Sequence, residues 1–381
     1  MRSPAVIVLE DGSRFEGYAW GALGARVGEV VFSTGMTGYQ ETLTDPSYAG
    51  QIVVMTAPHI GNTGMNDEDA ESRQIWVEGF VVRDPSPRPS NFRSQRSLED
   101  DLIQDEIVGI SGVDTRAITL ILREVGVMRG GIFSGETFEL SPEEQLQAVV
   151  EGPLMTGQSL SARVSVEVPR VVPSDGESVG ILAVVDLGIK ESTVRELASR
   201  GFEVHILPAD TGWDQIAELS PVALFYSNGP GDPAASEAQI LVLQQALTAG
   251  LPFFGICFGN QLLGRALGLE TYKLKYGHRG INQPVLDKTS GRVEITAQNH
   301  GFAVDAPLEG IFDSPAGFGR VEVSHFSLND NVVEGLRALD IPAFSVQYHP
   351  EAAAGPRDAN HLFDRFRDAV LEHLNTTREA C

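Results

Sequence analysis

The sequence predicts an α/β protein of two domains, in which a mostly parallel sheet with helices on both faces follows a smaller, β-rich α/β domain. The chain of 381 residues is longer than one hydrophobic core usually supports. Strand-like and helix-like runs alternate beyond residue 179, which is the pattern of βαβ units. Ahead of that region, short β-rich runs are broken by Gly and Asp.

The N-terminal half is expected to form short strands separated by long loops. We expect strands at 5–9, 29–32 and 51–56. Residues 33–48 and 58–66 are polar and Gly-rich, and loops of this length tend to be functional or interfacial. The acidic run at 67–71 is better interpreted as a solvated turn than as a metal cluster, so we assign no metal.

Two helices are predicted next. Ser97 indicates the start of a helix over 98–105, and a second helix is expected within 112–123. Arg116 and Arg123 of the second helix could bind an anion, but surface salt bridges are the simpler interpretation.

A stretch rich in proline and polar residues divides the chain. We place the linker at 171–178, between an N-terminal domain of residues 1–170 and a C-terminal domain of residues 179–381. In the C-terminal domain we expect strands at 179–186, 203–207 and 222–226, with helices at 192–199 and from Ser236 to about Gly250. Ser236 and Gln239 fit a capping box for the latter helix.

Composition excludes several classes of function. A formal net charge of −24 argues against a surface for nucleic acid or anionic membranes, which need basic patches. Only Cys257 and the terminal Cys381 are cysteines, too few for a secreted disulfide-rich fold. With no signal-peptide core and no apolar run of membrane-spanning length, the sequence predicts a cytoplasmic protein.

Cys257 lies in a predicted strand-to-helix turn, Gly255-Ile256-Cys257-Phe258-Gly259. The glycines let the backbone fold closely, and the thiol is placed at a helix N-terminus, which favours a thiolate and can hold an oxyanion. The turn alone leaves the alternative that Cys257 is a small buried hydrophobe. Ligands in parallel sheets bind beyond the carboxyl ends of the strands, where Gly229-Pro230-Gly231 is also expected.

A nucleophilic cysteine needs a base, and His349 with Glu351 is the best candidate pair. The strand-like run 343–348 ends in His349-Pro350-Glu351, and the proline keeps the two side chains in a fixed local geometry. The other seven histidines lack such a carboxylate at a strand end. We therefore predict Cys257 as nucleophile, His349 as base and Glu351 as the carboxylate that orients it.

Together the turn around Cys257, the run Ser227-Asn228-Gly229-Pro230-Gly231-Asp232-Pro233 and His349-Pro350-Glu351 resemble the class I, triad-type glutamine amidotransferases. Residues 33–48, 58–66 and 110–123 further resemble the N-terminal domain of carbamoyl-phosphate synthase small chains, so the resemblance covers nearly the whole chain. It implies an amidotransferase-like fold for the C-terminal domain. Phe258, Asn260 and Arg279 depart from the usual family pattern, which leaves pocket detail open.

The resemblance also implies site residues. Cys257 would attack the side-chain amide of glutamine, with the oxyanion held by the backbone N–H groups of Gly231 and Phe258. The glutamine contacts that it implies are Ser47, Gly229, Gly231, Phe258, Gln261, Asn299, Gly301 and Phe302. Because Ser47 comes from the N-terminal domain, the resemblance implies a pocket at the domain interface. On sequence alone, Ser47 and Asn299-His300-Gly301 are equally plain turn residues.

The function implied is that of the glutamine-hydrolysing subunit of carbamoyl-phosphate synthase, paired with a large subunit as a heterodimer; a higher oligomer of heterodimers is left open. No phosphate-binding G-x-x-x-x-G-K-[ST] motif is present, so ATP and Mg are expected on the large subunit and no cofactor in this chain. The product, carbamoyl phosphate, would feed arginine and pyrimidine biosynthesis. Two alternatives remain: a glutaminase serving another synthase, and a non-catalytic scaffold, which the intact Cys257, His349 and Glu351 disfavour.

Overall fold

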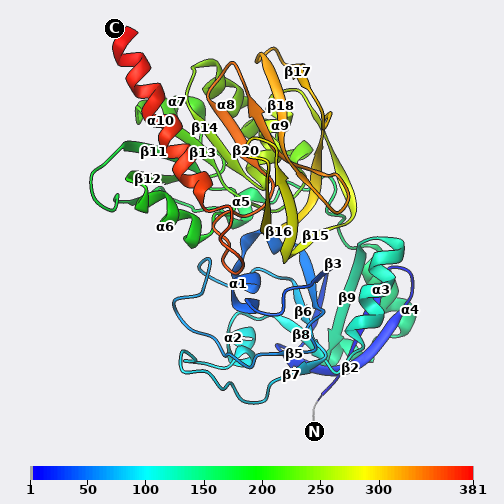
Figure 1. Cartoon of the computed structure of the whole chain (residues 1–381). Helices are drawn as coiled ribbons and strands as arrows, with labels where there is room; N and C mark the ends of the chain where they lie inside the picture. Colours follow the sequence, from blue (N-terminus) through cyan, green and yellow to red (C-terminus); the bar gives the residue numbers. More distant parts are fainter. Residues whose placement is uncertain (1–2, 381) are drawn as a thin grey trace. The chain divides into compact units, whose positions relative to one another are not determined.

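The computed structural model describes residues 3–380, which divide into two compact units (Figure 1). The first unit comprises residues 1–156 with 275–280, and the second comprises 157–274 with 281–381, as far as each is described. Met1, Arg2 and Cys381 lie outside the described residues.

The boundary between the units lies earlier than the predicted linker at 171–178. Carboxylates of the second unit bind the backbone of the segment that precedes the linker: Asp232 accepts a hydrogen bond from the N–H of Gly157 (2.8 Å), and Asp186 from that of Val166 (2.7 Å). Part of the predicted linker forms strand β10 (Arg170–Val172), which pairs with β12 (Phe202–Leu207). The strand partners of residues 170–172 lie more than 30 positions later in the sequence. The local composition of the predicted linker therefore gave no sign that part of it pairs as a strand.

In the first unit the described strands close into a barrel. They are β1 (Pro4–Leu9), β2 (Arg14–Gly21), β3 (Ala25–Ser33), β4 (Gln51–Met55), β6 (Gly79–Val81), β8 (Val108–Ser111) and β9 (Met128–Ser134), in the order β1-β2-β8-β6-β4-β3-β9. Antiparallel pairing of β9 with β1 closes the ring. Alternate residues point inward, so Ile7, Val30 and Ile52 pack in one cluster with residues of the other strands. The prediction of a β-rich domain with its three strands is confirmed, but closure was not predicted.

Helices cover the barrel. They are α1 (Tyr39–Thr44), η1 (Pro46–Tyr48), α2 (Leu98–Gln104), α3 (Thr115–Val125), η2 (Gly135–Glu139) and α4 (Pro142–Val150); the short strands β5 (His59–Ile60) and β7 (Asp84–Pro85) pair with each other. The Ser97 hydroxyl accepts the N–H of Asp100 (3.1 Å), which confirms the predicted start of α2. The segment 33–48, expected as a loop, contains α1 and η1.

The second unit is built on a mixed sheet. Its strands are β10, β11 (Gly180–Val185), β12, β13 (Ala223–Tyr226), β14 (Phe253–Ile256), β15 (Glu270–Asp287), β16 (Arg292–Asp305), β17 (Ile311–Asp313), β18 (Arg320–Ser327), β19 (Val333–Ala338) and β20 (Ala343–Val346). The order is β10-β12-β11-β13-β14-β20-β19-β18-β15-β16, with β17 on β18. Strands β12, β11, β13, β14 and β20 are parallel, as predicted, and the antiparallel extension beyond β20 is a further finding.

Helices pack on both faces of this sheet, as the sequence predicts (Figure 1). One core cluster includes residues of α7 (Trp213–Glu218), α8 (Glu237–Thr248) and α9 (Phe258–Ala266). The other includes residues of α6 (Glu191–Ser199) and α10 (His361–Ala380), while the short α5 is Ser161–Val164.

The capping box predicted at the start of α8 is wrong. Ser236 is the N-cap residue, but its side chain caps nothing and its hydroxyl has no hydrogen-bond partner. Gln239 instead donates to the carbonyl of Ala209 (2.9 Å). The hydrogen bond from Gln239 to Ala209, 30 positions earlier in the chain, therefore replaces the expected local bond between Gln239 and Ser236.

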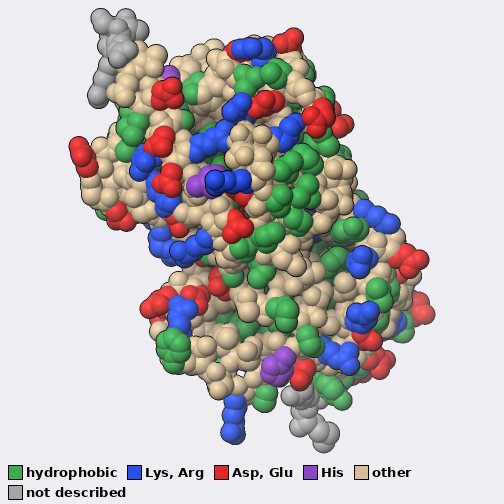
Figure 2. Space-filling view, in the orientation of Figure 1, with side chains coloured by type: hydrophobic (Ala, Val, Ile, Leu, Met, Phe, Trp, Pro, Cys, Tyr) green, Lys and Arg blue, Asp and Glu red, His purple; other side chains and the backbone are tan. Residues whose placement is uncertain are grey.

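Charged groups of both signs are interspersed on the face drawn in Figure 2. Within residues 3–380, no helix combines the length and the apolar character that crossing a bilayer requires.

Two glycines let β14 and α9 approach neighbouring backbone. A Cβ on Gly259 would lie 2.4 Å from the carbonyl oxygen of Tyr226, and one on Gly255 would lie 2.6 Å from the carbonyl carbon of Gly259. Real Cβ atoms do not approach backbone so closely, so either methyl group would push α9 away from the sheet.

We predict that Gly259→Ala lowers the free energy of unfolding by about 1–3 kcal/mol, the usual cost of overpacking. Denaturant unfolding of the full chain measures the loss. Gly212→Ala is the matched control, because its Cβ would meet only the flexible end of Gln215 at 3.9 Å. Equal stability of the two variants would contradict the close approach.

Candidate active site

Cys257 occupies the turn between β14 and α9 in a strained backbone conformation. Its φ and ψ are 53° and −97°, unusual for a residue with a Cβ, and such strain typically costs about 1–3 kcal/mol. The surroundings hold it there: its N–H donates to the carbonyl of Val346 on β20 (2.8 Å), and its carbonyl accepts from Asn260 (3.1 Å). The thiol donates to the carbonyl of Asn299 across a 3.6 Å S···O distance. The predicted elbow is therefore formed.

His349 follows β20 and is fixed by both its backbone and its ring. The N–H of His349 donates to the carbonyl of Ala297 on β16 (2.9 Å), and its Nδ1 lies 2.7 Å from Oε1 of Glu351. Both side chains are buried. The Nε2 atom has no hydrogen-bond partner, so it is the nitrogen available for proton exchange with the thiol.

Lys190, which the sequence analysis missed, forms an ion pair with Glu351 and so extends the pair of Glu351 and His349 into a line of three charged groups. Its Nζ lies 3.1 Å from Oε1 of Glu351 and donates to the carbonyl of Ala353 (2.8 Å). The Lys190 side chain is only 4 % exposed, so the ion pair is shielded from solvent. No local pattern marks this lysine, because the carboxylate it meets comes from a distant part of the chain.

The neighbouring charges shift the pKa values of Glu351 and His349 in opposite directions. Burial raises the pKa of Glu351, but the Lys190 charge and then the His349 charge and hydrogen bond outweigh it and lower this pKa to about 2. Burial likewise lowers the pKa of His349, but the charge of Glu351, the nearby Cys257 side chain and the hydrogen bond with Glu351 raise it to about 10. The imidazole is therefore cationic at neutral pH beside the thiol.

The predicted oxyanion groups lie on neighbouring turns of the second unit. Phe258 is the first residue of α9, so its N–H has no partner within the helix. Gly231 lies in the turn after β13 with φ of 107°. A hydrogen bond from Gly259 N–H to the Ser227 carbonyl (3.2 Å) joins the two turns. Which N–H groups hold an oxyanion stays a prediction.

Hydrogen bonds connect three of the predicted glutamine contacts with Cys257, since the N–H of Gln261 also donates to the Cys257 carbonyl (3.2 Å). Asn299 supplies the carbonyl that the thiol faces, and Gln261 donates to the carbonyl of Phe302 (2.9 Å). Gly229 and Gly231 lie in the turn after β13, and Gly301 lies between Asn299 and Phe302 on β16. Ser47 is buried in η1 of the first unit. The contacts of all these residues with glutamine stay predictions.

Asn260, one of the departures from the family pattern, has a clear structural place. It is fully buried, donates to Oε1 of Gln347 (3.1 Å) and accepts from the hydroxyl of Ser345 (2.8 Å). Gln261 donates to the same Gln347 oxygen (3.2 Å). The start of α9 is thus tied to the strand that leads to His349.

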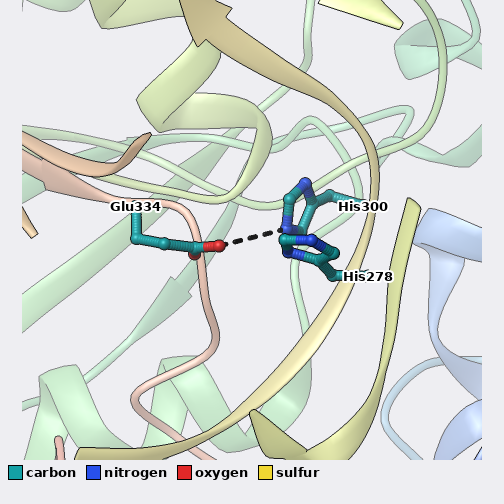
Figure 3. A group of neighbouring side chains, drawn as sticks. All are labelled: His278, His300 and Glu334. Carbon is teal, nitrogen blue, oxygen red and sulfur yellow. Dashed lines mark ion pairs between the residues drawn. The ribbon is translucent and has the colours of Figure 1, made fainter. Parts of the chain in front are cut away.

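A second polar group involves His300 and Glu334 (Figure 3). Nδ1 of His300 lies 2.9 Å from the Phe302 carbonyl, and its Nε2 lies 3.2 Å from the amide oxygen of Gln298 and 3.8 Å from Glu334. The third side chain drawn, His278, belongs to the segment 275–280 of the first unit. Both ring nitrogens of His300 thus face oxygen atoms of the second unit, an arrangement that braces β16 through the Phe302 carbonyl.

Comparison with known proteins identifies both parts of the chain. Residues 7–132 match the family model of the carbamoyl-phosphate synthase small chain, CPSase domain, and residues 183–369 match glutamine amidotransferase class-I. A protein of Streptomyces coelicolor named carbamoyl phosphate synthase small chain is 62 % identical over 96 % of this chain and 95 % of its own length. The chain belongs to the carbamoyl phosphate synthase small chain family. Family members so named from Bifidobacterium longum (57 % identical) and Mycobacterium tuberculosis (56 %) each align with 96 % of this chain and cover 93 % and 97 % of their own lengths.

Membership in the carbamoyl phosphate synthase small chain family confirms the predicted fold and class of activity. The chain carries a class I amidotransferase domain and is the glutamine-hydrolysing kind of subunit. The small-chain model falls within the barrel unit, and the amidotransferase model within residues that contain Cys257, His349 and Glu351.

The raised pKa of His349 predicts how pH affects stability. A group whose folded pKa exceeds its unfolded value stabilises the fold fully below the unfolded value, near 6.5, and loses this contribution as pH rises through about 10. We expect the difference in unfolding free energy between wild type and His349→Gln to shrink by more than about 1 kcal/mol, roughly one pKa unit, between pH 6 and 10.5. Urea unfolding at both pH values measures this.

His373→Gln, which changes a histidine on α10 with no side-chain bond to another described residue, is the control. Its effect on stability should show no comparable pH dependence. A constant difference for His349→Gln would mean that the imidazole is not held in its charged form.

Proposed function

We propose that Cys257 is the nucleophile that hydrolyses glutamine and that the ammonia released serves a large synthase subunit, which makes carbamoyl phosphate. The observation that carries this proposal is the Cys257 thiol on a strained turn beside a cationic His349, itself held by Glu351 and Lys190. Such a line supplies a nucleophile, a proton carrier and a group that fixes the carrier's orientation.

In the first half-reaction the proton of Cys257 resides on Nε2 of His349, and the thiolate sulfur attacks the carbonyl carbon of the glutamine side chain. A C–S bond forms, and the negative charge moves to the amide oxygen, which the N–H groups of Gly231 and Phe258 stabilise. His349 then gives its Nε2 proton to the nitrogen, the C–N bond breaks and ammonia leaves. The product on the chain is a γ-glutamyl thioester of Cys257.

In the second half-reaction water replaces ammonia. Nε2 of His349, now neutral, takes a proton from water as its oxygen attacks the thioester carbon, and the C–S bond breaks. Glutamate leaves and the Cys257–His349 pair is restored. Glu351 keeps the ring orientation through both steps, since its bond to Nδ1 leaves Nε2 alone to exchange protons.

The remaining parts of the proposal concern the substrate and the partner. We assign glutamine contacts to the eight residues predicted from the resemblance, supported by the burial of Gln261, Asn299 and Phe302 beside the thiol. ATP and Mg chemistry would belong to the large subunit, and this chain would work without a cofactor of its own. The pair would act in the cytoplasm as a heterodimer and supply arginine and pyrimidine biosynthesis.

The test is glutamine-dependent formation of carbamoyl phosphate by a mixture of this chain and the large synthase subunit. Cys257→Ser is expected to lower the glutamine-dependent rate at least about 10³-fold, because the poorer nucleophile removes the covalent step, while ammonia still supports synthesis. A glutamine-analogue electrophile should label the wild-type thiol, and glutamine should protect it.

Cys381→Ser is the matched control, since it removes the only other cysteine and should leave the rate and the labelling intact. Persistent glutamine-dependent synthesis by Cys257→Ser would overturn the assignment of the nucleophile. Absence of synthesis with wild type and glutamine, when ammonia works, would point to a glutaminase for another synthase.

A further inference from the structure

Tyr348, the residue before His349, donates a buried hydrogen bond to a carboxylate. Its side chain is fully buried, and its hydroxyl donates to Oε2 of Glu294 on β16 (3.1 Å). The hydroxyls of two other buried tyrosines, Tyr39 and Tyr226, donate to backbone carbonyls instead. Because a charged acceptor makes a stronger and more closely defined bond, the Tyr348 side chain is held more firmly than the other two.

Glu294 uses both of its carboxylate oxygens. Its side chain is only 5 % exposed, and Oε1 lies 2.6 Å from Nε2 of His361, the first residue of α10. Burial, followed by the charge of Glu294, raises the pKa of Tyr348 well above its ordinary value, so the phenol keeps its proton and remains a donor. Glu294 therefore joins the residue beside His349 both to β16 and to α10.

The same part of β16 holds His349 through its backbone. The N–H of His349 donates to the carbonyl of Ala297 (2.9 Å), three positions after Glu294. The carbonyl that faces the thiol belongs to Asn299, two positions further along the strand. One stretch of β16 thus contacts both the thiol and the backbone of the base. A change in how Tyr348 sits on β16 would consequently move the His349 imidazole relative to the sulfur.

A buried carboxylate is a costly way to fill this space. Two apolar side chains would pack there without a desolvation penalty, and replacing a buried polar pair by such residues is often neutral or stabilising. Stability alone therefore does not account for Glu294. A directional bond to a charged acceptor instead fixes where the segment that carries the base lies.

We propose that Glu294 is a positioning residue of glutamine hydrolysis, which acts through Tyr348 on the orientation of His349. The inference rests on the proposed function, in which His349 carries the protons. A misplacement of about 1 Å can slow an enzymatic step by about 10²-fold. Because neither Tyr348 nor Glu294 is among the predicted glutamine contacts, turnover should respond far more than the KM for glutamine.

The experiment compares four variants in the complex of this chain with the large synthase subunit. Tyr348→Phe removes only the hydroxyl, Tyr348→Phe with Glu294→Leu replaces both partners by apolar groups, and Glu294→Gln keeps an oxygen that accepts the bond. Tyr226→Phe is the matched control, because it removes the hydroxyl of another fully buried tyrosine of the same unit, which donates to a carbonyl of α8 (3.0 Å). For each variant we measure kcat and KM of glutamine hydrolysis, and urea unfolding of the chain alone.

We expect Tyr348→Phe to lower kcat at least about 10-fold and to change the KM for glutamine by less than about 3-fold. The double variant should recover the stability that Tyr348→Phe loses, since no buried carboxylate is left short of a donor, while its kcat stays low. Glu294→Gln should keep kcat within about 3-fold of the wild type, and Tyr226→Phe within about 2-fold.

A second readout needs neither glutamine nor the large subunit. The rate at which iodoacetamide alkylates Cys257 at neutral pH follows the thiolate fraction, which a cationic imidazole beside the sulfur increases. In chains that also carry Cys381→Ser, we expect Tyr348→Phe to slow this alkylation at least about 3-fold and Tyr226→Phe to leave it unchanged.

A double variant that regains turnover together with stability would reduce Glu294 to a structural role and overturn the inference. Unchanged turnover and alkylation in Tyr348→Phe would overturn it as well, as would an equal loss of turnover in Tyr226→Phe. If the wild type hydrolyses no glutamine, the proposed function fails. Slower alkylation of Tyr348→Phe would then still show that Glu294 and Tyr348 place the imidazole beside the thiol.

Discussion

The close approach of α9 to the sheet is the constraint on which the rest of the site depends. It requires glycine at 255 and 259, because a Cβ at either position would overlap backbone. Only with this approach can the chain turn from β14 into α9 within one residue, Cys257, held at a φ of 53°. The strain is maintained by bonds on both sides of the residue, to Val346 and from Asn260. The thiol is thereby presented at a helix N-terminus without freedom to retreat into the core.

A buried line of charges then makes this geometry chemically useful. Burial alone would neutralise a histidine, yet the charge of Glu351 keeps His349 cationic, and Lys190 in turn keeps Glu351 ionised. Burying any one of these charges alone would destabilise the fold, and the oppositely charged neighbour offsets that desolvation penalty. Removing Lys190 would therefore change the protonation of His349 through Glu351, although Lys190 makes no contact with the thiol. The mixed sheet places these three residues and Cys257 beyond the ends of three strands, β11, β14 and β20.

The two units contribute different kinds of chemistry. The amidotransferase unit has all the groups of the proposed covalent steps in one described body. The barrel unit, which carries the match to the small-chain family model, contains none of these covalent groups. A synthase that divides ammonia production from its use needs both: a site that releases ammonia and a face that holds the consumer in place.

The sequence by itself determined the features that depend on neighbours along the chain. Gly255 to Gly259 predicted the elbow, His349-Pro350-Glu351 the base and its carboxylate, and the strand–helix rhythm the parallel strands. Tertiary structure alone decided the others. Lys190 meets a segment 163 positions later in the chain, and the Asn299 carbonyl faces a thiol 42 positions earlier. Ser236 lost its predicted capping partner when Gln239 bonded Ala209, and barrel closure joined β9 to β1. Neighbouring residues determine turns and strand or helix ends, so the sequence predicts them. Contacts between distant segments form only when the chain packs, so the sequence alone does not reveal them.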